Sequence, residues 1–400
     1  MALFRETIAA VGYHIDEVTD RLLAGVRRHT AADPLLLQLM PYYGYGTETW
    51  LRLQGRVLQS HHLLAMEKPN PDVDTIWDNL HTMYHRFASK EVADVAVSAH
   101  FQAQTLQASS DREGYFAFEF ILKQPLATEQ LWHSVALTAG TPQSATDAGT
   151  GIVPTAATGK VLVPRLTSNF GIISDIDDTV LQTNATNLLK MARIVFLNSA
   201  HTRLPFEGVA AFYAALHRGS SGAEQNPIFY VSSSPWNLYD LLVEFMNIHG
   251  IPAGPLFLQD YGLEPDKFIT ASHQAHKLAA IVQIIRSYPD LNFILIGDSG
   301  QDDPEIYVDV LQQFPERICA IYIRDVSTAA RKTAVETLIA QANQLDVDML
   351  LVADTQAAAS HAYSQGWIRS EELSAVQIDQ QKDAAAPSDL ELLLEKSKPR

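Results

Sequence analysis

The feature that most constrains the fold is a series of short, continuous apolar runs in the second half of the chain. These runs are FGIIS, PIFYV, NFILIG, ICAIYI and DMLLVA. Amphipathic stretches with helical spacing, such as 209–216 and HKLAAIVQIIRSY, lie between them. A strand that is apolar at every position is buried on both faces, and its alternation with helices is typical of a parallel sheet covered on both sides. We therefore predict an α/β domain with a Rossmann-like parallel sheet over residues 167–377.

A different pattern occupies the residues before this domain, where short strand-like segments are separated by turn residues. TWLRLQGRVL alternates apolar and polar positions, as a strand with one exposed face does, and SSDREGYF carries a glycine in a hairpin-type turn. The regular spacing predicts a β-sandwich of immunoglobulin-like type over residues 31–166, with a helical insert at about 73–89. We further predict an N-terminal helix over 1–30 and a flexible tail over 378–400.

The charge balance limits the partners of the chain. It carries 29 Lys and Arg against 46 Asp and Glu, a formal net charge of −17. An acidic surface repels phosphate backbones, so we expect no nucleic-acid binding, and an anionic substrate needs a locally positive site. No apolar run approaches the ~18 residues of a membrane span, and the N-terminus lacks the features of a signal peptide. We expect a cytoplasmic protein without a transmembrane segment, which can still act peripherally at a membrane surface.

Acidic and hydroxyl residues follow three of the predicted strands. They are Asp175 and Asp177 after FGIIS, Ser232 and Ser233 after PIFYV, and Asp298 after NFILIG. Ligands of open parallel sheets bind at the carboxyl ends of the strands, so these side chains should meet at one edge. Lys277 begins an amphipathic segment before the last of these strands and can reach the same edge.

This combination of residues suits phosphoryl transfer through an aspartyl-phosphate. Asp175 is ionised at neutral pH and needs no general base as a nucleophile. Its charge and that of the substrate must be neutralised, which Mg²⁺ bound to carboxylates and the ammonium of Lys277 can do. Asp177 can protonate the leaving group and then activate the hydrolytic water, and Ser232 can hydrogen-bond a phosphoryl oxygen. Each residue alone has a simpler interpretation as a helix cap, a turn residue or a solvated charge; their order and position favour catalysis.

The same residues resemble those of a known superfamily. Asp175-x-Asp177-x-Thr179, Ser232, Lys277 and Gly297-Asp298 are similar to the four ordered motifs of the haloacid dehalogenase superfamily. SDIDDTVLQTNATNLL, FYVSSSPWNLYDLL and IGDSGQDDPEIY resemble the catalytic domain of the actin-patch-associated phosphatidate phosphatases and their bacterial relatives, over roughly 168–355. PYYGYGTETWLRLQGRVL resembles the N-terminal region of the bacterial members.

The resemblance implies a haloacid dehalogenase-like fold, Mg²⁺ as cofactor and hydrolysis of phosphatidate to diacylglycerol. It implies that Asp175 is the nucleophile and a metal ligand, and that Asp177 is the acid/base residue, whose backbone carbonyl also binds the metal. It also implies that Asp298 is a further metal ligand. Both Asp302 and Asp303 fit the spacing of the second acid in the fourth motif; we favour Asp303 because it begins the DPEIY stretch.

Three further residues are candidates for the site. Thr179 belongs to the first motif, and Ser233 is a candidate for binding the substrate phosphate beside Ser232. Arg203, in AHTRLPF, is either a contact of the substrate phosphate or headgroup, or a surface or pairing arginine.

The spacing of the motifs bears on the size of the substrate. The intervals from Thr179 to Ser232 and from Ser232 to Lys277 leave no room for a large cap domain. Capless members of the superfamily have open sites and tend to act on large substrates, which favours phosphatidate at a membrane surface. Two alternatives stay open: a phosphatase for a phosphoprotein or sugar phosphate, and a non-catalytic module in which the β-domain binds a membrane or protein partner.

Overall fold

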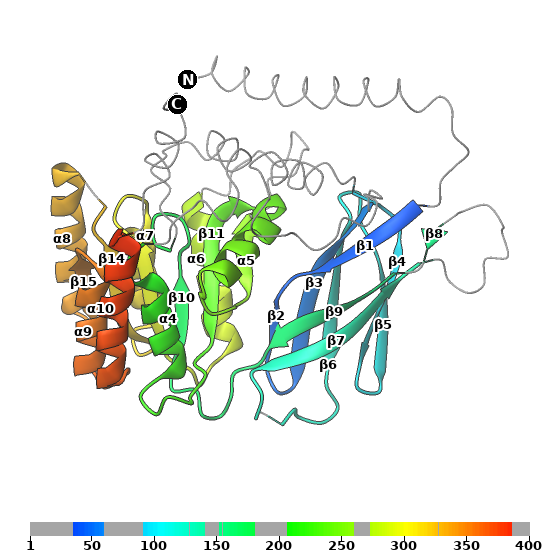
Figure 1. Cartoon of the computed structure of the whole chain (residues 1–400), viewed down its shortest axis with the longest axis horizontal. Helices are drawn as coiled ribbons and strands as arrows, with labels where there is room; N and C mark the ends of the chain where they lie inside the picture. The colour runs from blue at the N-terminus through cyan, green and yellow to red at the C-terminus, as the bar shows by residue number, and fades with distance from the viewer. Residues whose placement is uncertain are drawn as a thin grey trace, which may run out of the picture.

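The computed structural model shows two domains side by side, a β-domain and an α/β domain (Figure 1). It describes residues 35–59, 91–127, 129–140, 152–153, 155–180, 206–259, 273–326 and 328–385. The predicted N-terminal helix and the helical insert at 73–89 lie outside these ranges. The prediction of a β-sheet domain followed by a parallel α/β domain is confirmed. Among the described helices, none combines the length and the apolar composition needed to cross a membrane.

Within the described ranges, the β-domain is a sheet of nine strands in the order β5-β4-β7-β9-β2-β3-β1-β8, with β6 paired to β3. Its strands are β1 (Leu35–Pro41), β2 (Gly44–Gly46), β3 (Trp50–Gln59), β4 (Ala96–Phe101), β5 (Gln104–Ser109), β6 (Tyr115–Ile121), β7 (Trp132–Ala139), β8 (Ile152–Val153) and β9 (Thr155–Leu162). Most neighbours are antiparallel, which suits strands joined by short turns.

The β-domain has a core of its own because its strands are apolar on one face. Phe116, Phe118 and Phe120 alternate with exposed residues along β6, and they pack with Leu51 and Leu53 of β3 in one buried cluster. Strands that are not hydrogen-bonded neighbours, such as β5 and β6, also lie in contact, so the sheet curls over this core.

The α/β domain is built on a parallel sheet, for which the described residues supply six strands in the order β12-β11-β10-β13-β14-β15. The strands are β10 (Gly171–Ser174), β11 (Ile228–Pro235), β12 (Leu256–Gln259), β13 (Phe293–Asp298), β14 (Ile318–Arg324) and β15 (Asp348–Val352). The first strand, β10, lies in the middle, and the chain then builds outward on one side and afterwards on the other. The strand order therefore reverses between β10 and β13, as in doubly wound folds.

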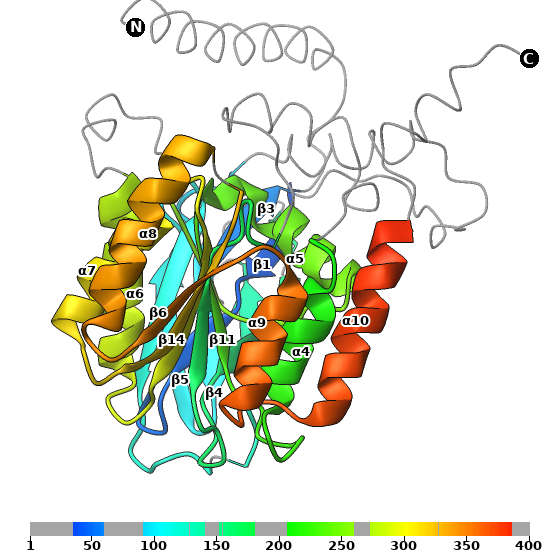
Figure 2. The same cartoon turned by 90° about the vertical axis from the view of Figure 1, so that its left-hand side faces the viewer.

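Helices cover both faces of this sheet (Figure 2). They are α4 (Val209–Arg218), α5 (Tyr239–Ile248), α6 (His273–Ser287), α7 (Asp303–Gln313), α8 (Ala329–Asn343), α9 (Thr355–Ser364) and α10 (Ser370–Ala385), with a short 3₁₀ helix η3 (Trp236–Leu238). Helices α4, α5, α9 and α10 contribute to one buried core, and α6, α7 and α8 to the other. Ile172 and Ile173 are adjacent in β10 and belong to opposite cores, which explains why both of these neighbouring positions are apolar.

Helix α10 differs from the sequence prediction at the C-terminal end. It continues through residue 378, where we expected a flexible tail to begin, and ends at Ala385. Val376 is fully buried in the α4 and α9 core, and Asp379 and Asp383 accept hydrogen bonds from the backbone N–H groups of Ala211 and Gly208. The polar composition of residues 378–385 did not indicate a helix. Two hydrogen bonds attach this part of α10 to the N-terminus of α4. Residues 386–400 lie outside the described part.

Aromatic residues join the two domains. Tyr42 stacks on Trp236, with ring centroids 4.9 Å apart and an interplanar angle of 12°, and it also contacts Tyr239. The backbone N–H of Tyr43 donates to the Tyr239 hydroxyl at 2.6 Å, and Gln283 of α6 donates to the Tyr45 hydroxyl. The β-domain therefore packs beside the edge strand β12 of the parallel sheet.

Candidate active site

The candidate site lies at the carboxyl ends of β10 and β13, where the strand order reverses. Asp175 follows the last residue of β10, and Asp298 is the last residue of β13. The backbone N–H of Asp175 donates to the carbonyl of Ile296 at 2.9 Å, which holds the two strand ends together. Sites in open α/β sheets form at this kind of reversal, because loops from the two neighbouring strands separate there.

Lys277 connects two of the predicted site residues. Its Nζ lies 2.7 Å from Oδ1 of Asp175 and 2.7 Å from Oδ1 of Asp303, and all three side chains are buried. Burial lowers the pKa of Lys277, but the two carboxylates more than offset this effect and the net pKa is raised. The ammonium group is therefore charged at neutral pH and partly neutralises the carboxylates around it.

Three buried carboxylates form a possible metal site. Asp175, Asp298 and Asp303 each offer one oxygen, and these oxygens all lie within 4.8 Å of one another. Burial, followed by the nearby Asp303 carboxylate, raises the pKa of Asp298 to about 7. Burial also raises the pKa of Asp175 well above its usual range, although Lys277 opposes the shift. The charges in this cluster are thus only partly compensated by the protein.

One oxygen in this cluster lacks both a hydrogen bond and an ion pair with the residues that the structure describes. Oδ2 of Asp175 is buried and accepts no hydrogen bond from any residue that the structure describes. A buried carboxylate oxygen without a donor is costly. A hard divalent cation bound by carboxylate oxygens would satisfy it, so the residues present could hold such an ion.

The structure distinguishes the two candidates for the second acid of the fourth motif. Asp303 is the first residue of α7 and is fully buried, and its Oδ2 accepts the backbone N–H of Asp298 at 3.1 Å. Asp302 lies at the N-cap position and is exposed. A Cβ atom on Gly297 would lie 2.6 Å from Oδ2 of Asp303, so glycine at 297 permits this close approach. Asp303, and not Asp302, belongs to the acidic cluster.

Asp177 is held by the serine-rich end of β11. The hydroxyl of Ser232 donates to Oδ2 of Asp177 at 2.7 Å, and the hydroxyl of Ser234 donates to the same oxygen at 3.1 Å. Ser232 in turn accepts the backbone N–H of Ser234 at 2.9 Å. The structure thus joins the first and second motifs through hydrogen bonds, and it orients the Asp177 carboxylate beside the strand that carries the candidate nucleophile.

The remaining predicted residues have different placements. Thr179 is buried, and its hydroxyl has no hydrogen-bond partner among the described residues. Ser233 is buried next to Ser232 in β11. Asp178 adopts a left-handed backbone (φ 58°), which turns the chain sharply after Asp177. Arg203 lies outside the described residues.

Two residues that sequence reasoning missed organise the loop between β13 and α7. Gln301 donates from Nε2 to the backbone carbonyl of Asp177 and to Oδ2 of Asp298, both at 3.0 Å. Arg331 of α8 donates to the backbone carbonyls of Ser299 and Gln301 at 2.9 and 2.6 Å and forms a bidentate pair with Glu305. Gln301 lies inside the fourth motif and could have been suspected from its position. Nothing in the sequence around Arg331 indicates its contacts.

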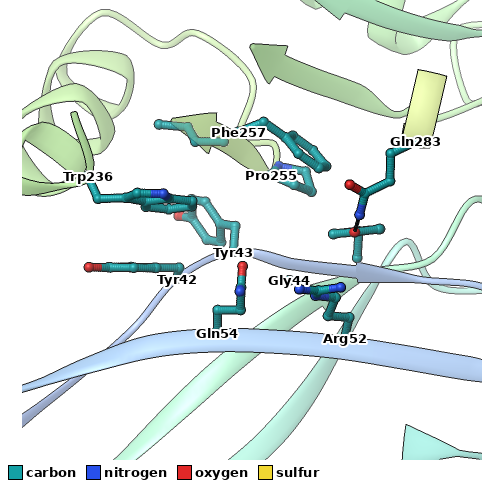
Figure 3. Close-up of a pocket in the computed structure, with 11 residues that line it drawn as sticks. Tyr42, Tyr43, Gly44, Arg52, Gln54, Trp236, Pro255, Phe257 and Gln283 are labelled. Carbon is teal, nitrogen blue, oxygen red and sulfur yellow. Dashed lines mark hydrogen bonds between the residues drawn. The ribbon is translucent and has the colours of Figure 1, made fainter. Parts of the chain in front are cut away.

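A separate pocket lies at the junction of the domains (Figure 3). Tyr42, Tyr43, Arg52 and Gln54 line it from the β-domain, and Trp236, Phe257 and Gln283 from the α/β domain. It holds about 100 Å³ of free space. Trp236 directly follows the β11 strand that carries Ser232 and Ser234. The aromatic contact between the domains is therefore adjacent in sequence to the serine-rich segment.

Comparison with known proteins supports a relationship to one family. The family model described as "Phosphatidate phosphatase APP1, catalytic domain" matches residues 170–325. Phosphatidate phosphatase APP1 of Saccharomyces cerevisiae is 37% identical over 160 residues, which are 40% of this chain and 26% of that protein. An uncharacterized protein of Schizosaccharomyces pombe is 33% identical over 167 residues, 41% of this chain and 26% of its own length. The chain thus spans about a quarter of the length of these curated relatives.

A solved structure adds little to this relationship. A carbohydrate acetylesterase from Xanthomonas citri matches with 10% identity, over 77% of this chain and 75% of that chain, at a TM-score of 0.24. At that score the similarity supports no conclusion about fold or chemistry. The sequence relationship covers β10, the Ser232 and Lys277 segments and the acidic cluster. Over residues 170–325 the chain is therefore similar to the catalytic domain of the APP1 phosphatidate phosphatases.

Proposed function

We propose that this chain is a Mg²⁺-dependent phosphatase of the haloacid dehalogenase type that hydrolyses phosphatidate to diacylglycerol. The observation that carries the proposal is the buried group of Asp175, Lys277, Asp298 and Asp303 at the carboxyl end of the sheet, inside a segment of the APP1 catalytic type. A carboxylate nucleophile beside a fixed cation is what transfer of a phosphoryl group to aspartate needs.

The reaction has two steps. The carboxylate of Asp175 attacks phosphorus, the bond to the glycerol oxygen breaks, and Asp177 in its protonated form gives its proton to that oxygen. Water then attacks the phosphorus of the aspartyl-phosphate and passes a proton to Asp177, and phosphate leaves as Asp175 is regenerated. The hydrogen bonds from Ser232 and Ser234 support this role, since they hold Oδ2 and with it the orientation of the Asp177 carboxyl group.

Charge neutralisation is shared between the protein and the cation. Lys277 lies 2.7 Å from Asp175 and can also contact a phosphoryl oxygen, and the hydroxyl of Ser233 in β11 can donate to another phosphoryl oxygen. Asp175, Asp298 and Asp303, with the backbone carbonyl of Asp177, would hold Mg²⁺. When bound, the ion would withdraw charge from the nucleophile and the phosphoryl group.

The choice of phosphatidate rests on the family relationship and on the expected absence of a cap. The intervals that would have to carry a cap, 181–205 and 260–272, lie outside the described residues. Without a cap, the binding energy must come from parts of the substrate remote from the phosphate, which the acyl chains of a lipid supply. We propose that the chain acts in the cytoplasm at a membrane surface, and that the curled β-domain, an immunoglobulin-like β-sandwich, helps to dock it there.

The test is a phosphate-release assay with Mg²⁺. We expect phosphatidate in mixed micelles to be hydrolysed with a much higher kcat/KM than glycerol 3-phosphate, which has the same headgroup without acyl chains. EDTA should abolish the activity. Asp175→Asn should lower kcat by at least about a thousandfold, because an amide cannot attack phosphorus, whereas the exposed Asp302→Asn should leave it near the unsubstituted level.

The outcomes distinguish the alternatives. Unchanged turnover in Asp175→Asn would overturn the mechanism. Equal rates on phosphatidate and glycerol 3-phosphate, or higher rates on sugar phosphates or phosphopeptides, would retain the phosphatase and reject the lipid substrate. Release from none of these substrates would favour a non-catalytic binding module.

A further inference from the structure

The side chain of Gln301 occupies a position that the chemistry described above does not use. Its Nε2 lies 3.0 Å from the backbone oxygen of Asp177 and 3.0 Å from Oδ2 of Asp298. Both oxygens belong to the group that would hold the cation. A neutral amide therefore bridges two proposed ligand atoms.

The distances at Gln301 also bear on metal coordination. Mg²⁺ takes six oxygen ligands in octahedral geometry at about 2.1 Å, so two adjacent ligand oxygens lie about 3 Å apart. The terminal atom of Gln301 is 3.0 Å from each of the two oxygens, a distance that fits a hydrogen bond and also fits adjacent ligands of one such ion. The carboxamide carries an oxygen as well as a nitrogen, and rotation of its last bond by 180° exchanges them.

Hydrogen bonds hold the backbone of the loop between β13 and α7, so only the side chain of Gln301 has to move when a metal ion binds. Arg331 donates to the backbone carbonyl of Gln301 at 2.6 Å, and the backbone N–H of Gln301 donates to Oδ1 of Asp298 at 2.9 Å. Gln301 itself is only partly buried. A rotation of the carboxamide therefore needs no movement of the loop.

We propose that Gln301 is a ligand of the cation. Its NH₂ group bridges the Asp177 carbonyl and Asp298 in this structure, and on metal binding the carboxamide turns so that Oε1 joins the coordination shell. The inference rests on the metal site of the proposed function and adds to it a neutral ligand from the loop between β13 and α7. The carboxamide would thus replace one of the water molecules that Mg²⁺ otherwise keeps.

Titration calorimetry of the purified full chain with MgCl₂, in a phosphate-free buffer without substrate, tests the proposal. We expect Gln301→Ala to raise the Kd for Mg²⁺ by about 10- to 100-fold, as loss of a group at a metal site does. Gln301→Glu should keep the affinity at or above that of the unsubstituted chain, because a carboxylate oxygen at the same position can also bind the ion. Gln312→Ala is the matched control, since Gln312 is exposed on α7 and lies outside the site.

Gln301→Glu also separates a ligand from a purely structural hydrogen-bond donor. Its carboxylate cannot donate to Asp177 or Asp298, so thermal unfolding in EDTA should occur at a lower temperature, and Mg²⁺ should restore the midpoint. If Gln301 only donated hydrogen bonds, Gln301→Glu would bind Mg²⁺ more weakly than the unsubstituted chain, and this result would overturn the proposal. An unchanged or lower Kd in Gln301→Ala would do the same. If the unsubstituted chain bound no Mg²⁺, the metal site of the proposed function would fall as well.

Discussion

Lys277 and Asp175 form a buried ion pair with 2.7 Å between Nζ and Oδ1. They are brought together by two elements on different parts of the chain, α6 and the end of β10, and the same ammonium group also contacts Asp303. One cation therefore holds the candidate nucleophile and a candidate metal ligand in one arrangement before any substrate arrives.

Removal of the Lys277 ammonium group should destabilise the protein when no metal ion is bound. Lys277→Met leaves two buried carboxylates without their counter-charge, so we expect the free energy of unfolding at neutral pH to fall by about 3–5 kcal/mol. Urea unfolding in EDTA measures the change. Lys332→Met is the control, because Lys332 forms an exposed pair with Asp325 and the loss of an exposed pair should lower the free energy of unfolding far less. Equal effects of the two substitutions would show that the buried pair contributes no more to the free energy of unfolding than the exposed pair does.

The acidic cluster should make stability depend on pH. The ordinary pKa of an aspartate is 3.8, whereas that of Asp298 is raised to about 7 by burial and by Asp303. Between these values the folded state retains a proton that the unfolded chain has released, so in EDTA the free energy of unfolding should decrease as the pH rises from about 4 to about 7. The raised pKa of Asp175 acts in the same direction. Urea unfolding across this range should show the decrease, and Asp298→Asn should reduce its slope; stability that rises with pH here would contradict the argument.

Asp302 and Asp303 should differ sharply in metal binding. Asp303 is fully buried in the cluster, while Asp302 is exposed. We expect Asp303→Ala to raise the Kd for Mg²⁺ at least about tenfold and Asp302→Ala to leave it nearly unchanged. Calorimetric titration of both variants measures this, and the opposite ranking would transfer the ligand role to Asp302.

Arg331 should act as a positioning residue for the loop that carries Asp298 and Gln301. It donates to the backbone of Ser299 and Gln301 and pairs with Glu305, so Arg331→Met removes several contacts at once. We expect weaker Mg²⁺ binding, by about tenfold, because an outer contact that orients ligands is lost. Arg331→Lys should recover only part of the affinity, since an ammonium group cannot reproduce the bidentate pair. A normal Mg²⁺ affinity in Arg331→Met would exclude this role.

Much of the fold follows from local pattern. The apolar runs FGIIS, PIFYV, NFILIG, ICAIYI and DMLLVA lie on β10, β11, β13, β14 and β15, because strands covered by helices on both faces need apolar residues at every position. The alternating TWLRLQGRVL is β3, with one face in the core of the β-domain. The polar residues at the ends of the parallel strands could be predicted to meet, since all carboxyl ends lie at the same edge.

The tertiary structure decided what these local patterns leave open. Whether Asp302 or Asp303 enters the cluster depends on the phase of α7, because successive residues of a helix point about 100° apart. Three contacts join residues that are distant in the sequence. Lys277 contacts Asp175, Gln301 donates to Asp177, and Arg331 donates to the backbone of Gln301. Such contacts arise from how the elements pack, and the sequence around Arg331 carries no sign of them. The chain therefore determined by itself where its strands lie and which chemistry their ends carry, whereas packing decided which of those side chains touch.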